Sequence, residues 1–179
     1  MRFGRLCAAL FGGILLLCMI ATWFIAPFQV QGTSMEPTLH NNQIVFVWEF
    51  PQTWAKLTGS QYVPRRGSVV IVKKSPILGE QLIKRVIGVP GDKVIINNSL
   101  TVYNQAQPNG FDPDIAPYGK NLQKPQGVFT TQVANGQVFV MGDNRDPGAS
   151  IDSRSSLGNV PSDNLVGKVV LRIFPFTIF

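Results

Sequence analysis

A long uncharged apolar stretch near the N-terminus constrains this chain most. Leu6–Phe28, 23 of the 179 residues, carries no charged side chain. As a helix it would extend about 35 Å, which exceeds the roughly 30 Å of a bilayer core. Arg2 and Arg5 precede it, and basic residues favour the cytoplasmic side. The sequence therefore predicts a cytoplasmic segment at 1–5, a transmembrane helix at 6–28 and an extracytoplasmic domain at 29–179.

A cleavable signal peptide is the alternative for this stretch. The apolar region of such a peptide covers about 7–15 residues, so this one is too long. Ala21 and Ala26 are small enough to mark cleavage sites, but Pro27 would follow a cut after Ala26. A retained anchor is therefore preferred.

Beyond residue 28, short runs of Val, Ile and Phe alternate with turns of Gly, Pro, Asn and Asp, which is typical of β-strands. Closely spaced strands predict a mostly β fold, an antiparallel sandwich or barrel-like sheet. Residues 97–136 are rich in Asn, Gln, Pro and Gly and are expected to form a variable β-ribbon excursion. Pro51–Lys56 is expected to form one helical turn. The expected strands are Gln43–Trp48, Ser68–Lys73, Gln81–Gly88, Lys93–Ile96, Leu100–Tyr103, Gly127–Thr131, Gln137–Met141 and Val166–Ile173.

Composition excludes several kinds of site. The formal net charge is +6, but the basic residues are spread along the chain, so no nucleic-acid groove is expected. This charge would suit a domain beside anionic lipid, or simply a basic surface. Cys7 and Cys18 both lie in the apolar stretch, which excludes a disulfide framework or a cysteine zinc site elsewhere. His40 is the only histidine. We therefore expect no metal and no cofactor.

The segment Val30–His40, VQGTSMEPTLH, places Ser34 in a Gly- and Pro-containing turn soon after the apolar stretch. Ser34 is either a turn or capping residue or a nucleophile held near a membrane. A serine nucleophile needs a partner that takes its proton. His40 belongs to the same turn and is interpreted as a surface residue, so a lysine is the next candidate. Such a lysine must be neutral, with its pKa lowered from about 10.4 towards 7–8.

Lys84 is the lysine best placed for this role. It lies in Gln81–Gly88, QLIKRVIG, where strand alternation puts it on one face with Leu82 and Val86, while Arg85 takes the other face. Burial among aliphatic side chains lowers a lysine pKa. The alternative is that Lys84 extends its amine into water from a strand edge.

A charged loop, Gly142–Arg154 or GDNRDPGASIDSR, follows one of the expected strands. Its acidic and basic residues alternate, so ion pairs within the loop are easy to form, and Ser150 and Ser153 add hydroxyl groups. Taken alone, such a loop is usually a solvated, salt-bridged turn.

These segments, in this order, resemble the type I signal peptidases, membrane-bound serine/lysine endopeptidases that remove signal peptides from exported proteins. The resemblance covers most of residues 28–175 and is weak across 97–136. Its motifs are Gly32–Leu39, Arg66–Val72, Lys84–Asp92 and Gly142–Asp146 followed by Ser150, Asp152, Ser153 and Arg154.

The resemblance implies that Ser34 is the nucleophile and Lys84 the general base. It also implies that Ser150 hydrogen-bonds and orients the lysine amine, and that Asp152 and Arg154 form a charged pair behind the site. The loop before Ser150 is two residues longer than is usual in the family.

Gly32 and Met35 flank Ser34 and are expected to support the site. By the same resemblance, the Ser34 backbone N–H belongs to the oxyanion hole. Some members of the family add a serine hydroxyl at the position of Gly32, so a second backbone donor or a water must serve here.

The resemblance further implies a single-pass protein of the plasma (inner) membrane whose partners are preprotein signal peptides and the bilayer. A bound peptide would lie along a strand edge and be cut after small residues. A dedicated maturation peptidase for one precursor, such as a conjugative pilin, remains an alternative, as does a non-catalytic membrane-tethered β-domain that binds a partner. A self-cleaving repressor-type serine/lysine protease is disfavoured by the anchor and by the lack of a DNA-binding helix pair.

Overall fold

The computed structural model describes residues 7, 10–13, 24–74, 79–115 and 122–179. Most of the predicted transmembrane helix, 6–28, and the basic segment 1–5 lie outside these ranges. Within the described residues, no helix combines the length and the apolar character needed to cross a membrane.

The end of the apolar stretch is a strand, not a helix. Residues Ile25–Gln29 form β1, which pairs antiparallel with β2, Ile44–Trp48. The prediction of a helix as far as residue 28 is therefore wrong for residues 25–28. Pro27 cannot donate a backbone hydrogen bond inside a helix, but it is tolerated in an edge strand such as β1.

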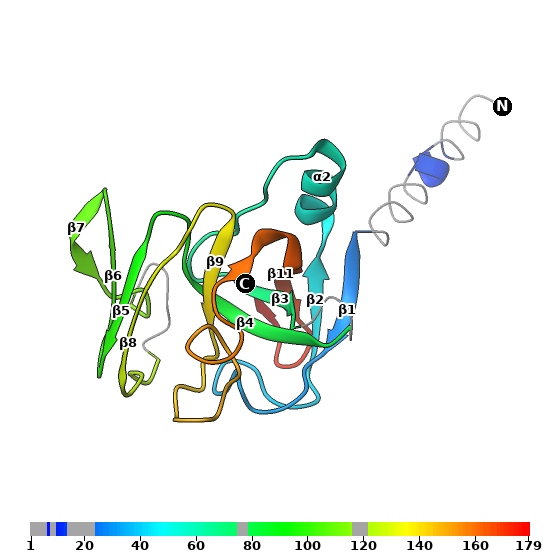
Figure 1. Cartoon of the computed structure of the whole chain (residues 1–179). Coiled ribbons are helices and arrows are strands. Elements are labelled where there is room, and N and C mark those ends of the chain that lie inside the picture. Colours follow the sequence, from blue (N-terminus) through cyan, green and yellow to red (C-terminus); the bar gives the residue numbers. More distant parts are fainter. Residues whose placement is uncertain (1–6, 8–9, 14–23, 75–78, 116–121) are drawn as a thin grey trace.

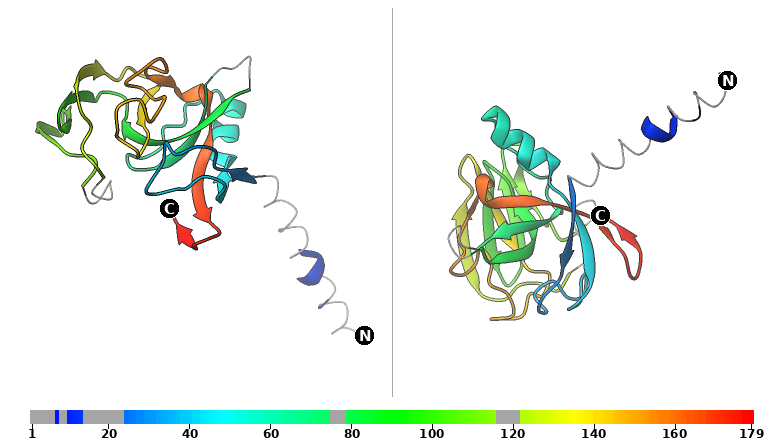
Figure 2. Two further views of the ribbon diagram at one scale, coloured as in Figure 1. Left: turned by 90° about the horizontal axis from the view of Figure 1, so that it is seen from below. Right: turned by 90° about the vertical axis from the view of Figure 1, so that its right-hand side faces the viewer.

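The larger sheet is antiparallel and contains most of the strands of the structure, including β1 and β4 (Figure 1). Its order is β1-β2-β11-β3-β4-β9-β10, and the short β12 pairs with β11. Figure 2 shows that this sheet is strongly curved. Its remaining strands are β3 (Val69–Lys73), β4 (Gln81–Gly88), β9 (Gln137–Met141), β10 (Val160–Pro161), β11 (Leu165–Arg172) and β12 (Thr177–Ile178).

One half of β4 has an open edge. Strand β3 pairs with β4 along Gln81–Arg85, whereas β9 pairs with β4 only from Arg85 to Gly88. In the part of the chain that the structure describes, residues 81–84 therefore have a strand partner on one side only. An extended peptide can add to such an edge through main-chain hydrogen bonds.

A second sheet has the order β7-β6-β5-β8 and lies on the left in Figure 1. Three of its strands belong to the 97–136 excursion and build on β5. The bounds are β5 (Lys93–Asn97), β6 (Leu100–Asn104), β7 (Gln107–Phe111) and β8 (Val128–Gln132).

The expectation of a mostly β, antiparallel fold is confirmed, and the eight expected strands coincide with β2 to β6, β8, β9 and β11. Sequence reasoning missed β1, β7, β10 and β12. The expected turn at Pro51–Lys56 is a longer helix, α2, which covers Phe50–Thr58 and ends at Gly59 in the left-handed conformation, with φ +68°. The 3-10 helix η1, Ser162–Asn164, precedes β11.

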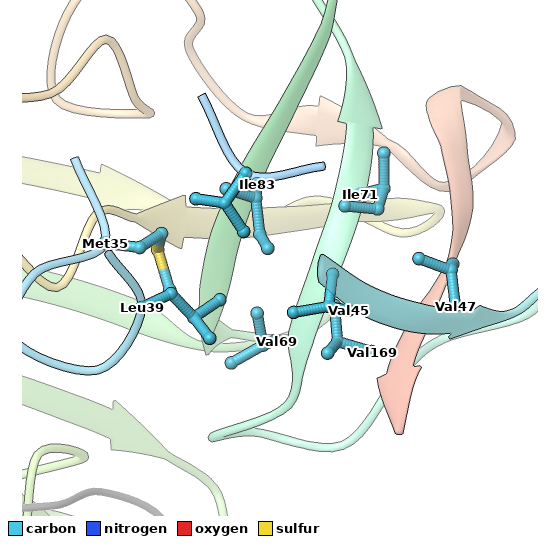
Figure 3. Packing of buried hydrophobic residues seen from close by; sticks show 9 residues of the cluster. Met35, Leu39, Val45, Val47, Val69, Ile71, Ile83 and Val169 are labelled. Atoms are coloured by element: carbon cyan, nitrogen blue, oxygen red, sulfur yellow. The ribbon is translucent and has the colours of Figure 1, made fainter. Parts of the chain in front are cut away.

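The core beneath the Ser34 turn fixes that turn against the larger sheet. Met35 and Leu39 are buried and pack with Ile83 of β4 and Val69 of β3 (Figure 3). Burying side chains of this size stabilises a fold by about 1.5–3 kcal/mol each. Met35 therefore anchors the backbone that carries Ser34.

Candidate active site

The Ser34 turn is closed by its own backbone bonds. Glu36 N–H donates to the Thr33 carbonyl at 3.1 Å, and Leu39 N–H donates to the Met35 carbonyl at 2.9 Å. Gly32 has a φ of +82°, a conformation that favours glycine, and its N–H donates to Asn41 Oδ1 at 2.9 Å. These contacts leave the Ser34 side chain half-buried at the surface of the larger sheet.

Lys84 reaches Ser34 from β4. Its Nζ lies 2.8 Å from Ser34 Oγ and 2.9 Å from the Ile83 carbonyl oxygen. The residue is only 1% exposed, so the alternative in which its amine extends into water is wrong. Leu82 and Val86, which strand alternation places on the same face of β4 as Lys84, belong to one aliphatic cluster with residues of β3, β9 and β11.

Burial lowers the pKa of Lys84 from its ordinary value of 10.5 to about 8. Arg154 also lowers this pKa, whereas the carboxylates of Asp152 and Asp143 raise it. An amine with such a pKa is substantially neutral at mildly alkaline pH and can then accept a proton from a serine hydroxyl. A serine hydroxyl next to a group that can take its proton is one way in which serine nucleophiles are activated.

Asp143 pairs with a residue outside its own loop. Arg85 Nε donates to Asp143 Oδ1 at 2.7 Å, and Arg85 Nη1 donates to the Gly67 carbonyl at 2.7 Å. Both charged residues are buried. Sequence reasoning placed Arg85 on the opposite face from Lys84 but did not identify this pair, because nothing local connects a strand residue to a loop 58 residues later.

Asp152 and Arg154 form a pair within the loop. Arg154 Nη2 and Nε donate to the two carboxylate oxygens at 2.8 and 3.0 Å, and Gly142 N–H donates to Asp152 Oδ2 at 3.0 Å. Burial raises the pKa of the Asp152 carboxyl, but these hydrogen bonds outweigh it and leave the pKa below its ordinary value. The solvated turn considered for this loop is wrong here, since Asp152 is buried and braces the backbone at Gly142.

Ser150 packs against Gly142 beside Ser34. A Cβ added to Gly142 would lie 2.4 Å from both Ser150 Oγ and the Ser34 carbonyl oxygen. The Ser150 hydroxyl is buried and has no hydrogen-bond partner within the part of the chain that the structure describes. The structure thus brings Ser150 to the site without the hydrogen bond to Lys84 that the resemblance implies. Ser150 lies in the loop that is two residues longer than is usual in the family.

Within the part of the chain that the structure describes, the Ser34 carbonyl is hydrogen-bonded, whereas the Ser34 N–H is not. The Ser34 carbonyl accepts a hydrogen bond from Asn144 N–H at 3.1 Å. Among the described residues, no acceptor is bonded to the Ser34 N–H. The Gly32 N–H is already used by Asn41, so it is not free to act beside the Ser34 N–H.

A cavity of about 350 Å³ opens in front of Ser34 and Lys84. It lies between the two strand edges described above, with residues 27–29 of β1 on one side and residues 81–84 of β4 on the other. Its other lining residues are Gln31 and Gly79.

His40 is exposed, and its Nδ1 lies 3.6 Å from Glu36 Oε1. It is a surface residue, as expected. Among the described residues, no cluster of three or more His, Cys, Asp or Glu side chains has the geometry to hold a metal ion.

Comparison with known proteins identifies the family. The family model "Signal peptidase, peptidase S26" matches residues 3–174. "Signal peptidase I U" of Bacillus subtilis (strain 168) is 32% identical over 159 residues, covering 86% of this chain and 78% of that protein. "Signal peptidase IB" of Staphylococcus aureus (strain N315) is 32% identical over 180 residues, covering 92% of this chain and 85% of that protein. A crystal structure of a signal peptidase I from Enterococcus faecalis V583 is 29% identical, with a TM-score of 0.44 and coverage of 61% of this chain and 98% of that chain.

The resemblance drawn from the sequence motifs is thereby confirmed. The family model spans almost the whole chain, and the two bacterial relatives match over most of their own length. The chain belongs to the signal peptidase family, peptidase S26.

Proposed function

We propose that this protein is a serine endopeptidase that cleaves signal peptides from exported preproteins, with Ser34 as the nucleophile and Lys84 as the general base. The observation that carries the proposal is the 2.8 Å separation of Lys84 Nζ and Ser34 Oγ, with the lysine buried and its pKa lowered to about 8. Membership of the signal peptidase family supports the substrate class.

The reaction is an acyl transfer in two stages. Neutral Lys84 accepts the Ser34 hydroxyl proton while Oγ attacks the carbonyl carbon of the scissile peptide bond. The resulting ammonium then donates a proton to the leaving amine, which releases the mature protein. Lys84 next accepts a proton from water, and the hydroxide attacks the acyl carbon. The bond between that carbon and Oγ then breaks, the Lys84 ammonium returns its proton to Ser34 Oγ, and the signal peptide leaves.

The open Ser34 N–H supports its role as one donor to the oxyanion that forms during each attack. Gly32 carries no side-chain hydroxyl to add to it, and its own N–H is bonded to Asn41. A second donor therefore comes from another group or from water when substrate is bound. Loss of one such donor costs about 3–4 kcal/mol in other serine proteases, so the second donor matters.

The open edges of β1 and β4, on either side of the cavity, support binding of the substrate as an extended strand. An extended peptide fits the cavity between residues 27–29 and 81–84 and can form main-chain hydrogen bonds with both edges. The peptide lies over Ser34 at one end of the β4 edge. Cleavage after small residues is the specificity that the resemblance to the family implies.

The remaining predicted residues act through packing and charge. The Asp152 carboxylate accepts a hydrogen bond from the Gly142 N–H and forms an ion pair with Arg154. Both of its oxygens are therefore hydrogen-bonded, although it is buried near Lys84. Ser150 fills the space between Gly142 and the Ser34 turn. Met35 anchors the turn in the core.

An exposed aromatic cluster supports a location at the membrane surface. Phe50 of α2 contacts Trp48, Trp54 and Phe24, with ring centroids 6.4, 6.0 and 4.8 Å apart, respectively. Trp54 is 56% exposed, and a further exposed apolar side chain, Leu57, lies on the same helix. Phe24 stands at the end of the long apolar stretch, so the cluster lies where that stretch joins the domain. Aromatic side chains favour the bilayer interface, and Arg2 and Arg5 support a cytoplasmic N-terminus.

The test is cleavage of a preprotein by the purified full chain in detergent, with products identified by mass spectrometry. We expect a cut after a small residue, complete loss of cleavage in Ser34→Ala and retention of it in the matched turn variant Thr33→Ala. Cleavage of several unrelated preproteins supports a general peptidase, whereas cleavage of a single pilin-type precursor would indicate the dedicated enzyme. Undiminished cleavage by Ser34→Ala would overturn the proposal.

A further inference from the structure

Arg145 links the loop beside Ser34 to the 97–136 excursion. Its Nε donates to the Gly142 carbonyl at 2.8 Å, while Nη1 and Nη2 donate to the two oxygens of Asp114 at 2.7 and 2.6 Å. Arg145 is 1% exposed and Asp114 is 4% exposed. One buried guanidinium therefore joins two segments that are far apart in the sequence.

The backbone at Gly142 lies against the Ser34 turn. The space above the Gly142 Cα is filled by the Ser34 carbonyl oxygen and by Ser150, which leaves no room for a Cβ. Two residues later, Asn144 N–H donates to the same Ser34 oxygen at 3.1 Å, and Asn144 Nδ2 donates to the Thr33 carbonyl at 3.3 Å. The backbone at 142–144 thus determines where the Ser34 backbone lies.

We propose that Asp114 is a positioning residue for the cleavage reaction. It fixes the Arg145 guanidinium, which fixes the Gly142 carbonyl and thereby the backbone that supports Ser34. This inference rests on the proposed function. Asp114 reaches neither Ser34 nor Lys84 itself, so its effect passes through Arg145.

The chemistry of the pair explains why both partners are needed. A carboxylate that accepts two parallel N–H bonds holds a guanidinium in one plane, which directs the remaining Nε–H at a single acceptor. Without Asp114, Arg145 would be a buried and unpaired charge. It would turn towards water or another acceptor, and the Gly142 carbonyl would lose its donor.

Asp92 offers a matched control. It is also a fully buried carboxylate held by two nitrogens of one arginine, Arg66, and it accepts a further bond from Val89 N–H at 2.8 Å. Asp92 bonds to neither the Gly142 loop nor the Ser34 turn. Replacing each aspartate by asparagine removes the same charge from a similar pair, but only one pair supports Ser34.

The experiment measures kcat and KM for preprotein cleavage by the full chain in detergent, together with hydrogen–deuterium exchange across residues 142–146. Displacement of a reacting group by about 1 Å can cost about 100-fold in rate, so we expect Asp114→Asn to lower kcat by about 10- to 100-fold with KM within about twofold. Exchange across 142–146 should rise. Asp92→Asn should keep kcat within about twofold and leave that exchange unchanged, and Asp114→Glu should restore part of the lost kcat.

Wild-type kcat in Asp114→Asn, an equal loss in Asp92→Asn or unchanged exchange across 142–146 would each overturn the inference. If Asp114→Asn does not fold, Arg145→Lys takes its place, because it keeps the charge but not the three hydrogen bonds. Failure of both variants to fold also overturns the inference, since the pair would then serve the fold. A wild-type chain that cleaves no preprotein contradicts the proposed function instead, and the exchange measurement still tests the positioning.

Discussion

Lys84 Nζ lies 2.8 Å from Ser34 Oγ, although the two residues are 50 positions apart in the sequence. The serine comes from a turn fixed by Met35 and Leu39, and the lysine comes from the half of β4 that has an open edge. One arrangement therefore places the proposed nucleophile, its proposed base and a free strand edge at the same cavity. This is what cleavage of an extended peptide requires.

Replacing Lys84 by methionine should stabilise the protein at neutral pH. The folded-state pKa of about 8 is below the ordinary 10.5, so wild-type stability is lowest below pH 8 and rises as the pH increases from about 8 to 10.5. Below pH 8, keeping the buried Lys84 amine protonated destabilises the folded protein by about 3 kcal/mol. Lys84→Met removes this cost, but it also removes the hydrogen bonds to Ser34 and Ile83, so the net stabilisation is smaller.

Urea unfolding of the full chain in detergent at pH 7 and pH 10 measures this effect. The difference between Lys84→Met and wild type should be larger at pH 7 than at pH 10. Lys93→Met, at an exposed position, provides the control for replacing a lysine by methionine. A Lys84→Met difference that does not change with pH would be inconsistent with a buried lysine of lowered pKa.

A methyl group at Gly142 should disable the site. In Gly142→Ala the new Cβ would meet the Ser34 carbonyl oxygen at 2.4 Å, so one of the two backbones must move. Overpacking of this kind costs about 1–3 kcal/mol of stability. Because the Ser34 backbone is displaced, kcat should fall by about 100-fold.

The double variant Gly142→Ala/Ser150→Gly separates the two obstacles at this position. It removes the Ser150 side chain but leaves the Ser34 carbonyl in place, so it should not recover activity. Recovery to the wild-type kcat in the cleavage assay would show that the close approach to Ser34 does not matter.

Replacing Asp152 by asparagine should shift the pH dependence of cleavage to lower pH. The Asp152 carboxylate raises the pKa of Lys84, and its removal leaves Arg154, which lowers that pKa, without its partner. The midpoint of kcat/KM against pH should therefore fall by about one pH unit or less. A midpoint that moves upwards would contradict this charge arrangement.

The sequence allowed Lys84 to be identified because the cause of its burial is local. Strand alternation and two aliphatic neighbours on the same face indicated Lys84 as the best-placed lysine, and the structure buries it to 1% exposure. The turn at Ser34 was recognisable for the same reason, since Gly32 and Pro37 lie within a few positions of it.

Contacts between distant segments could not be predicted in this way. The pairs Arg85–Asp143 and Arg145–Asp114 join residues from different parts of the chain, and no local pattern specifies them. The strand β7, with the sequence QPNGF, also lacks alternating apolar residues and is held by its hydrogen bonds to β6. The helix expected through residue 28 was wrong at its end because the pairing of β1 with β2 is likewise non-local.

The role of Lys84 as the base is tested most directly by the pH dependence of kcat/KM for preprotein cleavage by the full chain in detergent, from pH 6 to pH 10. Activity should rise with pH as Lys84 loses its proton, with a midpoint near the pKa of about 8, and Lys84→Ala should be inactive throughout. A midpoint near that of free lysine, or wild-type cleavage by Lys84→Ala, would contradict the assignment of Lys84 as the base that activates Ser34.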